Sequence, residues 1–389
     1  MSSMNKINLE SLNTRKLKVG FLGGGFESAV GRAHRAAIEM DQRFELVSGC
    51  FSRKPEVSKS TALKYCIDLD RSYSDIDHFL SSEASQLDAV VIMTPQDQHS
   101  KHVMRCLEAD LPVICEKALV GSVEEALLIQ RKLLSSQGFL AVTYNYTGFP
   151  ILRELRYMIK HGKLGKIQQV QIEMPQEGFA RLGANGQPIT PQDWRLQDNK
   201  VPTLSLDLGV HIHMMIRFLT GEQPLEVVST SKSYGNFNQV TDSISCISNY
   251  SNDISCSIWY SKSALGYRNG LKVRIFGSKG SAEWVQEDSE HLNISDNSGN
   301  RLLVDRASNN ISVANHLRYT RFKAGHPAGF IEAFANYYYD VADALKYYLL
   351  KKNSVAQEYV FGIEESLEGL RMLEAISKSS SNKRWEEIV

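Results

Sequence analysis

Apolar positions in the first third of the chain alternate between short continuous runs and helical stripes. A run over 16–22 ends in three glycines at 23–25, a helical stripe follows over 30–40, and a second run covers 44–51. Strand, glycine turn, helix and strand in this order are typical of the mononucleotide-binding half of a doubly wound fold.

The alternation continues to about residue 144. We expect helices at 56–65, 76–80, 98–109 and 123–134, and strands at 87–93, 111–115 and 139–143. The run 87–93 is continuously apolar, as expected of a parallel strand that is buried on both faces. Residues 1–145 are therefore predicted to form an α/β Rossmann domain, which is a doubly wound parallel sheet that binds a dinucleotide.

The pattern changes near Tyr146, and residues 146–389 are predicted to form a second, C-terminal α+β domain. After a helix at 151–160, strand-like runs occur at 167–174, 225–231, 243–250, 254–261, 271–276 and 282–285. Asn252-Asp253 and Lys279-Gly280 are suited to hairpin turns. A last helix is expected at 328–350, and the serines at 379–381 are interpreted as a polar tail. The strands predict a large, mostly antiparallel open sheet that helices cover on one face.

Size and charge narrow the class of protein. The chain has 389 residues, which suits two domains, and its 44 basic and 44 acidic residues balance. The absence of a basic tail or stripe disfavours nucleic acid as a partner. No apolar run reaches membrane-spanning length, and residues 1–14 are polar rather than signal-like. Six cysteines without a C-x-x-C pair are interpreted as buried, reduced thiols, so we expect a cytoplasmic protein.

The glycine turn suits a dinucleotide, because glycines let the backbone approach a pyrophosphate and the next helix offers free N–H groups. The third glycine of G-x-G-x-x-G would fall at Ser28, whereas the next glycine is Gly31, eight residues after Gly23. We interpret this as a turn with a three-residue insertion. The alternative is a glycine-rich turn in an ordinary α/β domain.

Three further segments could carry chemistry. Thr94 to His99 follows a buried strand, where ligands bind in doubly wound sheets, although it could be only a capped loop. Glu116-Lys117 follows the next strand, where a lysine shielded from water can exchange protons, although a surface ion pair is the alternative. Asp207 and His211 are four residues apart, so on a helix they share a face and could act on one ligand, or form only a surface pair.

A metal site is not expected. His211 and His213 would point about 200° apart on a helix and so form a poor metal pair. A metal-dependent lyase or hydrolase that uses these histidines and Glu173 therefore lacks suitable ligand spacing.

These segments together resemble the glucose–fructose oxidoreductase and inositol dehydrogenase family (Gfo/Idh/MocA), from about Lys18 to Tyr348. The resemblance rests on the glycine turn and on motifs in a fixed order. These motifs are Thr94-Pro95 with His99, Glu116-Lys117, Trp194-Arg195, Asp207 to His211, Gly325-His326-Pro327 and Phe334-Ala335-Asn336, the last two being typical of a longer-chain branch.

The family implies hydride transfer between NAD(P) and a secondary alcohol of a sugar, sugar derivative or cyclitol. By match, the catalytic set is Lys117, Asp207 and His211, and either Lys117 or His211 is the base. The cofactor residues would be Gly23, Gly25, Phe26, Ser52, Arg53, Thr94, Pro95, His99, Glu116, Lys117, Trp194 and Arg195. The substrate residues would be Lys117, Asn145, Tyr146, Asp207, His211 and His326. The family also implies a homo-oligomer, a dimer or tetramer, formed through the C-terminal sheet.

Two positions qualify the resemblance. Ala118 stands where the family usually has the proline that shapes the lysine loop. Ser52 and Arg53 stand where an NAD-preferring strand usually ends in an acid, so NADP is slightly favoured over NAD. A non-catalytic dinucleotide-binding sensor or scaffold is the alternative function, but such a protein has no need of Lys117, Asp207 and His211 together.

Overall fold

The computed structural model describes residues 15–351 and 357–389, which divide into two compact units. The first unit contains the chain up to Asn145 together with Phe330–Ser366, and the second contains Tyr146–Gly329 and Leu367–Val389. The chain thus leaves the first unit where the strand–helix alternation ends. The later segment 330–366 also belongs to the first unit. A single division of the chain at residue 145 assigns this segment to the second domain instead.

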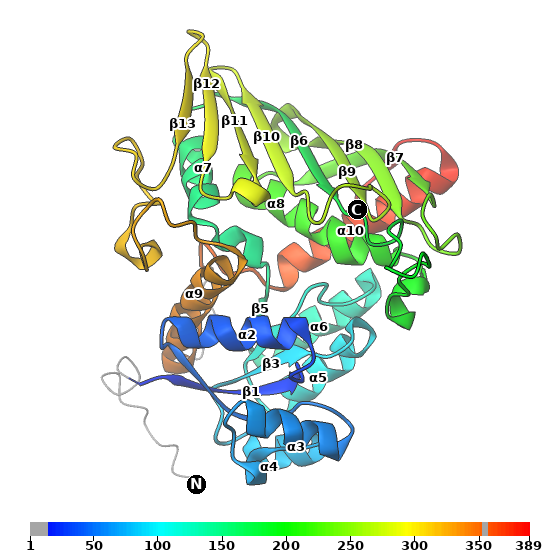
Figure 1. Cartoon of the computed structure of the whole chain (residues 1–389), viewed down its shortest axis with the longest axis vertical. Coiled ribbons are helices and arrows are strands. Elements are labelled where there is room, and N and C mark those ends of the chain that lie inside the picture. The colour runs from blue at the N-terminus through cyan, green and yellow to red at the C-terminus, as the bar shows by residue number, and fades with distance from the viewer. Residues whose placement is uncertain (1–14, 352–356) are drawn as a thin grey trace. The chain divides into compact units, whose positions relative to one another are not determined.

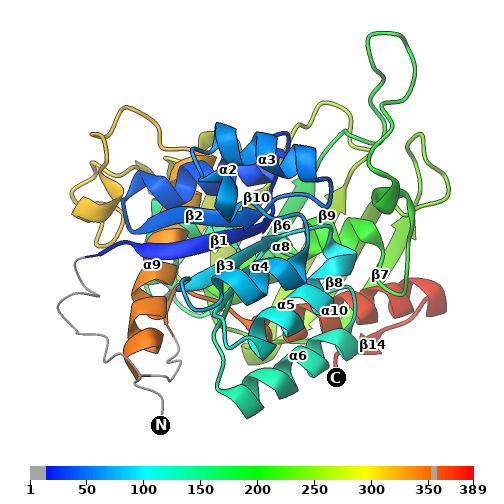
Figure 2. The same cartoon turned by 90° about the horizontal axis from the view of Figure 1, so that it is seen from below.

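A five-stranded parallel sheet forms the centre of the first unit, with the order β2-β1-β3-β4-β5. Its strands are β1 (Leu17–Gly23), β2 (Phe44–Cys50), β3 (Ala89–Met93), β4 (Val113–Cys115) and β5 (Leu140–Val142). Its helices are α2 (Ala29–Met40), α3 (Pro55–Lys64), α4 (Ile76–Glu83), α5 (His99–Glu108), α6 (Val123–Ser136) and α9 (Phe330–Lys351). Helices lie on both faces of the sheet (Figures 1 and 2), and every residue of β3 and β4 is buried. The predicted doubly wound Rossmann sheet is confirmed.

The turn between β1 and α2 explains the irregular glycine spacing. Gly23 and Gly24 have φ angles of +84° and +68°, which favour glycine. Ser28 caps α2 by accepting the Gly31 N–H at 3.3 Å. A Cβ on Gly31 would lie 2.2 Å from the carbonyl oxygen of Gly24. Gly31 therefore allows the close contact between helix and turn, three residues later than the simple motif would place it.

A nine-stranded sheet forms the second unit, in the order β13-β12-β11-β10-β6-β9-β8-β7-β14. Its strands are β6 (Ile167–Pro175), β7 (Pro224–Lys232), β8 (Ser243–Tyr250), β9 (Ile254–Ser261), β10 (Lys272–Gly277), β11 (Gly280–Val285), β12 (Leu292–Asp296), β13 (Arg301–Val304) and β14 (Glu386–Glu387). Each neighbouring pair is antiparallel except β6 with β9. Helices α7 (Pro150–Lys160), α8 (Val210–Thr220) and the main part of α10 (Ile363–Asn382) lie along one face (Figure 1). The predicted mostly antiparallel open sheet is confirmed.

Turn chemistry sets the register of two hairpins in this sheet. Asn252 and Asp253 join β8 to β9 with φ angles of 58° and 64°, a conformation that short polar side chains tolerate. Lys279 precedes β11 in the second hairpin, which pairs β10 with β11. Both turns lie where the sequence predicted them.

The C-terminal part of the chain differs from the sequence prediction. Residues 379–381 are not a polar tail, because they lie in the long helix α10, which follows the helix that we expected to be last. The Ser379 and Ser380 hydroxyls accept the backbone N–H groups of Ser229 and Ser231 in β7, at 3.0 and 2.9 Å. These serines were misinterpreted because their partners are about 150 residues away. Strands β12, β13 and β14, which are short, were also missed.

The six cysteines are all free thiols, and five are buried. Cys66 is exposed, which corrects the expectation of buried thiols at that position. Over residues 15–351 and 357–389, no helix combines the length and the apolar character needed to cross a membrane.

We predict that Gly31→Ala destabilises the protein by about 1–3 kcal/mol, because the added methyl group would collide with backbone that cannot move freely. The free energy of unfolding in urea measures the effect. Gly178→Ala is the matched control, since an added Cβ there meets nothing within 4 Å. Equal stability of the two variants would show that Gly31 is not needed for the packing.

Candidate active-site residues

Parallel pairing brings the predicted cofactor segments to one edge of the first unit's sheet. Gly23 pairs with Met93 in β3, and Cys115 at the end of β4 pairs with Ile92 and Val142. The glycine turn, Thr94-Pro95, Glu116-Lys117 and Asn145 all follow these strand ends. The carboxyl edge of such a sheet is where ligands bind, and strand order reverses at β1 and β3.

The residues of the glycine turn fit a dinucleotide. A Cβ on Gly23 would lie 2.8 Å from the Met93 backbone, so the turn can hold no side chain there. Phe26 extends from the turn, with the Lys64 ammonium 4.3 Å from its ring centroid, and its backbone N–H donates to Thr61 Oγ1 at 3.2 Å. The N-terminus of α2 opens directly at this turn, where backbone N–H groups favour a phosphate.

The segment that follows β2, Ser52-Arg53-Lys54, contains two cationic residues and no acidic one. The Ser52 hydroxyl accepts the backbone N–H of Lys54 at 3.1 Å, and both Arg53 and Lys54 are exposed. Within the described residues, the Arg53 guanidinium has no hydrogen bond or ion pair. A ligand phosphate could therefore take up its donors.

His99 joins two of the strand-end loops. Its ring is 1% exposed, with Nδ1 2.9 Å from the Ala118 carbonyl oxygen and Nε2 2.8 Å from that of Thr94. Burial lowers the pKa of His99. The Thr94 hydroxyl lies 2.9 Å from Nδ1 of His102, whose pKa burial lowers to about 4. His99 thus fixes the Thr94 loop against the lysine loop from behind.

Glu116 is held rigidly beside Lys117. Its Oε1 accepts from His34 Nε2 at 2.8 Å and from the Thr143 hydroxyl. Burial opposes ionisation of Glu116, but these hydrogen bonds and the Lys117 charge hold its pKa below the usual range. The Lys117–Ala118 peptide bond is cis, and Lys117 itself is half-buried.

Asn145 follows β5 at the same edge and is 5% exposed. Its buried Nδ2 finds no hydrogen-bond acceptor among the described residues. An unpaired buried donor costs free energy unless a ligand satisfies it, which fits the predicted role of Asn145 in substrate binding.

In the second unit, two cations share one oxygen of Asp207. This residue lies in a π-helical turn, Ser205–Gly209, that leads directly into α8. Arg195 and Lys262 both pair with Oδ2 of Asp207, and the Arg195 guanidinium lies 4.3 Å from the Trp194 ring centroid. The structure thus brings together Trp194, Arg195 and Asp207, which the sequence singled out separately.

His211 lies one turn beyond Asp207, is 6% exposed and packs edge-on against Tyr146, with ring centroids 4.7 Å apart. The Tyr146 hydroxyl accepts from Asn269 Nδ2 at 2.9 Å. Burial raises the pKa of Tyr146 to about 12, which keeps the phenol protonated at neutral pH. Tyr146 therefore contacts both His211 and Asn269 within the second unit.

Other candidates of the second unit contact different residues. His326 is exposed; its ring packs against Phe322 and its carbonyl oxygen accepts from Arg306. His213 binds Glu368, and Glu173 pairs with Arg274. Within the described residues, no group of three or more His, Cys, Asp or Glu side chains could hold a metal ion.

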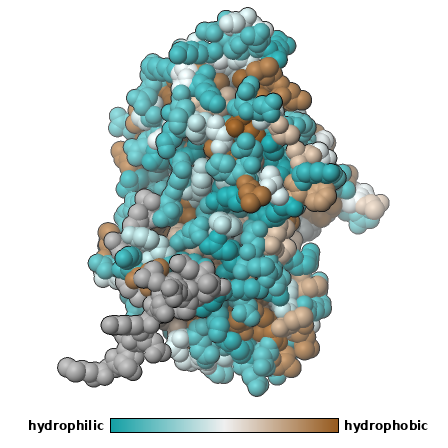
Figure 3. All heavy atoms as spheres, turned by 90° about the vertical axis from the view of Figure 1, so that its left-hand side faces the viewer, coloured by the Kyte–Doolittle hydropathy of each residue, from teal (hydrophilic) through white to brown (hydrophobic). Residues whose placement is uncertain are grey.

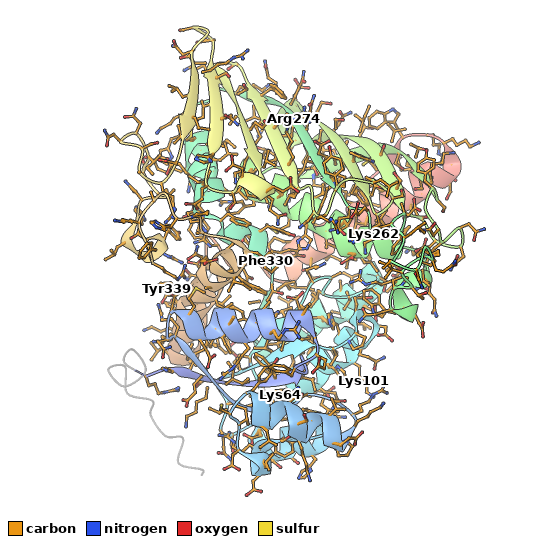
Figure 4. All side chains as sticks on the ribbon, viewed as in Figure 1. Lys64, Lys101, Lys262, Arg274, Phe330 and Tyr339 are labelled. Atoms are coloured by element: carbon orange, nitrogen blue, oxygen red, sulfur yellow. The ribbon has the colours of Figure 1, made fainter. Side chains whose placement is uncertain are left out.

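Lys262 is a site residue that sequence reasoning missed. It directly follows β9 and is 6% exposed (Figure 4). Its backbone N–H donates to the Asp242 carbonyl oxygen at 2.7 Å, and its ammonium lies 5.2 Å from the Phe179 ring centroid. The available signal was its position at a strand end, but the partner, Asp207, is 55 residues earlier.

Comparison with known proteins identifies relatives of both parts of the chain. Residues 17–144 match the family described as "Oxidoreductase family, NAD-binding Rossmann fold", and residues 152–283 match the "GFO/IDH/MocA C-terminal domain". "Uncharacterized oxidoreductase YfiI" of Bacillus subtilis is 26% identical over 98% of this chain and 99% of its own. Inositol 2-dehydrogenase of Rhizobium meliloti is 26% identical over 68% of this chain and 74% of its own.

A solved structure shares the whole fold. The inositol dehydrogenase homologue of Azotobacter vinelandii, complexed with NADH and myo-inositol, superposes with a TM-score of 0.86 and 26% identity. The match covers 96% of this chain and 98% of that one.

We predict that Lys262→Met lowers the free energy of unfolding by about 1–3 kcal/mol, because one of the two cations that balance the Asp207 carboxylate is lost. Urea denaturation measures the loss. Lys272→Met is the matched control, since it breaks a more exposed Lys–Glu283 pair of 2.8 Å and should cost less than about 1 kcal/mol. A cost for Lys262→Met no larger than for the control would contradict this ion pair.

Proposed function

Because the chain belongs to the Gfo/Idh/MocA oxidoreductase family, we propose that it transfers a hydride between a nicotinamide dinucleotide and a carbinol carbon of a sugar, sugar derivative or cyclitol. The observation that carries the proposal is the shared carboxyl edge of the first unit's sheet. There the glycine turn and Lys117 follow strands of one parallel sheet, and this family has an NAD-binding Rossmann fold.

The cofactor would be held by residues at that edge. Gly23 and Gly25 leave room for the pyrophosphate beside the N-terminus of α2, and Ser52 and Arg53 would face the adenosine ribose. Phe26, Thr94, Pro95 and Glu116 would line the same edge, with Trp194 and Arg195 of the second unit at the nicotinamide end. When bound, the nicotinamide supplies the hydride acceptor or donor. His99 would support these contacts from behind.

The chain's own groups would manage the hydroxyl proton. A carbinol carbon can lose hydride only as its hydroxyl loses a proton, so a base must lie at that oxygen. Either His211 takes this proton while a charged Lys117 stabilises the developing alkoxide, or a neutral Lys117 takes the proton and thereby becomes the positive charge beside the oxygen. Asp207 is fixed as an anion by Arg195 and Lys262, from which position it orients His211 and the substrate hydroxyls. Asn145, Tyr146 and His326 complete the substrate contacts.

The arginines of the second unit favour an uncharged polyol over a phosphorylated substrate. Arg181 and Arg268 both pair with Glu177, at 3.7 and 3.1 Å. Arg195 pairs with Asp207. These three arginines are thus already paired with carboxylates of the chain. The substrate is therefore a neutral sugar or cyclitol, as in the myo-inositol complex of the Azotobacter relative.

NADP is favoured over NAD because the end of β2 has a hydroxyl and two cations where an acid would repel a 2′-phosphate. The Arg53 donors suit that phosphate.

The protein would form a homo-oligomer, a dimer or tetramer, through the open face of the nine-stranded sheet. This contact would cover apolar side chains such as Ile247 and Leu303, which are 47% and 63% exposed. On the face seen in Figure 3, hydrophobic groups are spread in patches among hydrophilic residues.

Six free thiols fit a reducing compartment, so we place the protein in the cytoplasm.

We predict that the protein binds NADPH more tightly than NADH, and that Arg53→Ala weakens NADPH binding by about tenfold or more while leaving NADH binding unchanged. Quenching of tryptophan fluorescence during titration measures both affinities. Arg131→Ala, on the exposed face of α6, is the control. Equal loss of both cofactors in Arg53→Ala would mean that Arg53 stacks on the adenine instead.

We predict that Lys117→Met lowers kcat by about a hundredfold or more, because an acid–base group and a positive charge are removed together. The assay follows absorbance of the reduced nicotinamide with a panel of neutral sugars and cyclitols that includes myo-inositol. Lys59→Met, an exposed lysine on α3, should retain full activity. Cofactor binding without turnover of any member of the panel would favour the sensor or scaffold function.

A further inference from the structure

Four side chains of the first unit form a continuous hydrogen-bonded chain that ends beside Lys117. The Tyr338 hydroxyl lies 2.5 Å from His34 Nδ1, and His34 Nε2 lies 2.8 Å from Glu116 Oε1. The Thr143 hydroxyl donates to the same carboxylate oxygen. These contacts join α9, α2 and the loops after β4 and β5.

His34 and Tyr338, in this series of hydrogen-bonded side chains, are shielded from solvent. His34 is 0% exposed and Tyr338 is 1% exposed. The His34 ring packs edge-on against Phe334 and Phe21, with centroids 4.5 and 6.5 Å away. Polar groups in such apolar surroundings must satisfy each other, so their geometry is tightly specified.

For the uncharged form of the imidazole, the contacts favour one tautomer of His34. An ionised Glu116 only accepts hydrogen bonds, so His34 carries its proton on Nε2. The lone pair of Nδ1 is then left to accept the Tyr338 hydroxyl proton. Burial raises the pKa of Tyr338 well above its usual value, so this hydroxyl remains a donor. Tyr338 thereby favours the tautomer in which His34 donates to Glu116 through Nε2.

We propose that His34 is a positioning residue, held in its Nε2–H tautomer by Tyr338, that fixes the Glu116 carboxylate and with it the loop carrying Lys117. This inference rests on the proposed function, in which Lys117 acts on the substrate. It adds a link between the helix that follows the glycine turn and the loop of the reactive amine.

The placement of His34 separates this role from cofactor binding. The glycine turn is organised by Ser28, which caps α2, and by the contact of Gly31 with Gly24. His34 lies beyond these residues and faces the aromatic side chains. Its loss should therefore reduce turnover more than cofactor affinity, which it can change only through Glu116 and the Lys117 loop.

The acid side of the pH profile offers a second readout. Without the His34 donor, the Thr143 hydroxyl is the hydrogen-bond donor that the described residues leave to Glu116, and the Lys117 charge remains beside it. The carboxylate should therefore bind a proton at a higher pH. The low pKa of Glu116 in the intact protein is set against burial by donors and charge. Activity that needs the anion should consequently disappear at a higher pH as the solution is acidified. The titratable and charged groups that face Glu116 are His34 on α2, Tyr338 on α9, His99 on α5, Cys115 in β4 and Lys117 on its own loop.

The test uses the full-length protein and three variants. His34→Leu removes both hydrogen bonds, whereas His34→Gln retains an N–H donor near the position of Nε2. Tyr338→Phe removes only the hydroxyl and serves if His34→Leu does not fold. Tyr73→Phe is the matched control, because it removes another buried hydroxyl that donates to a carboxylate, Glu83 Oε1 at 3.0 Å.

For His34→Leu we expect kcat to fall about tenfold or more and the acid limb of the pH profile to move up by about one unit. The Kd for NADPH should rise by a smaller factor than kcat falls. His34→Gln should restore most of kcat, and Tyr338→Phe should give a smaller loss in the same direction. In ¹⁵N spectra of labelled histidine, His34 should be the Nε2–H tautomer in the wild type and a mixture of tautomers in Tyr338→Phe.

Several outcomes would overturn the inference. One is a His34→Leu variant whose kcat and pH profile match those of Tyr73→Phe, while the wild type oxidises myo-inositol or another neutral polyol; the proposed function would then stand alone. Another is a wild-type His34 that carries its proton on Nδ1. The ¹⁵N spectra detect this outcome without an activity assay. A wild type that is inactive on the whole panel would remove both this inference and the proposed function.

Discussion

The parallel pairing of β1 with β3 is the constraint on which the first unit depends. It brings Gly23 level with Met93, so any side chain at Gly23 would collide with backbone, and it directs every strand end to one edge. The remaining strands extend this edge from Ser52 to Asn145. Residues from five loops can therefore meet a single ligand although they are spread over more than ninety positions of the chain.

Behind this edge, buried polar side chains keep the loops in place. His99 bridges the loops after β3 and β4, and His34 holds Glu116 from the side of α2. Each bond satisfies a group that would otherwise be unpaired away from water, so the geometry is rigid rather than merely compact. The loop that carries Lys117 thus has the support that the proposed proton transfer would require.

The second unit uses charge for the same purpose. Asp207 is fixed by a cation from the Trp194 segment and by Lys262 from the end of β9. In the same unit, the fully buried Glu154 carboxylate accepts three backbone N–H groups, those of residues 312–314, at 2.6–3.1 Å. An irregular segment is thereby held without strand pairing. Removing one cation from the Asp207 ion pairs would leave part of the carboxylate charge unbalanced.

The sequence by itself determined the class of fold, most element positions and the identity of the family. Periodicity and turn residues are local properties, so β8 and β9 lie where they were predicted. Only the tertiary structure decided which side chains meet, because Lys262, His34 and Ser379 find partners 55, 82 and 150 residues away. No local pattern encodes such distances. Gly31 illustrates both contributions. The sequence shows that a glycine stands three positions after the place that the simple glycine motif predicts, and the structure explains it by the packing of Gly31 against Gly24.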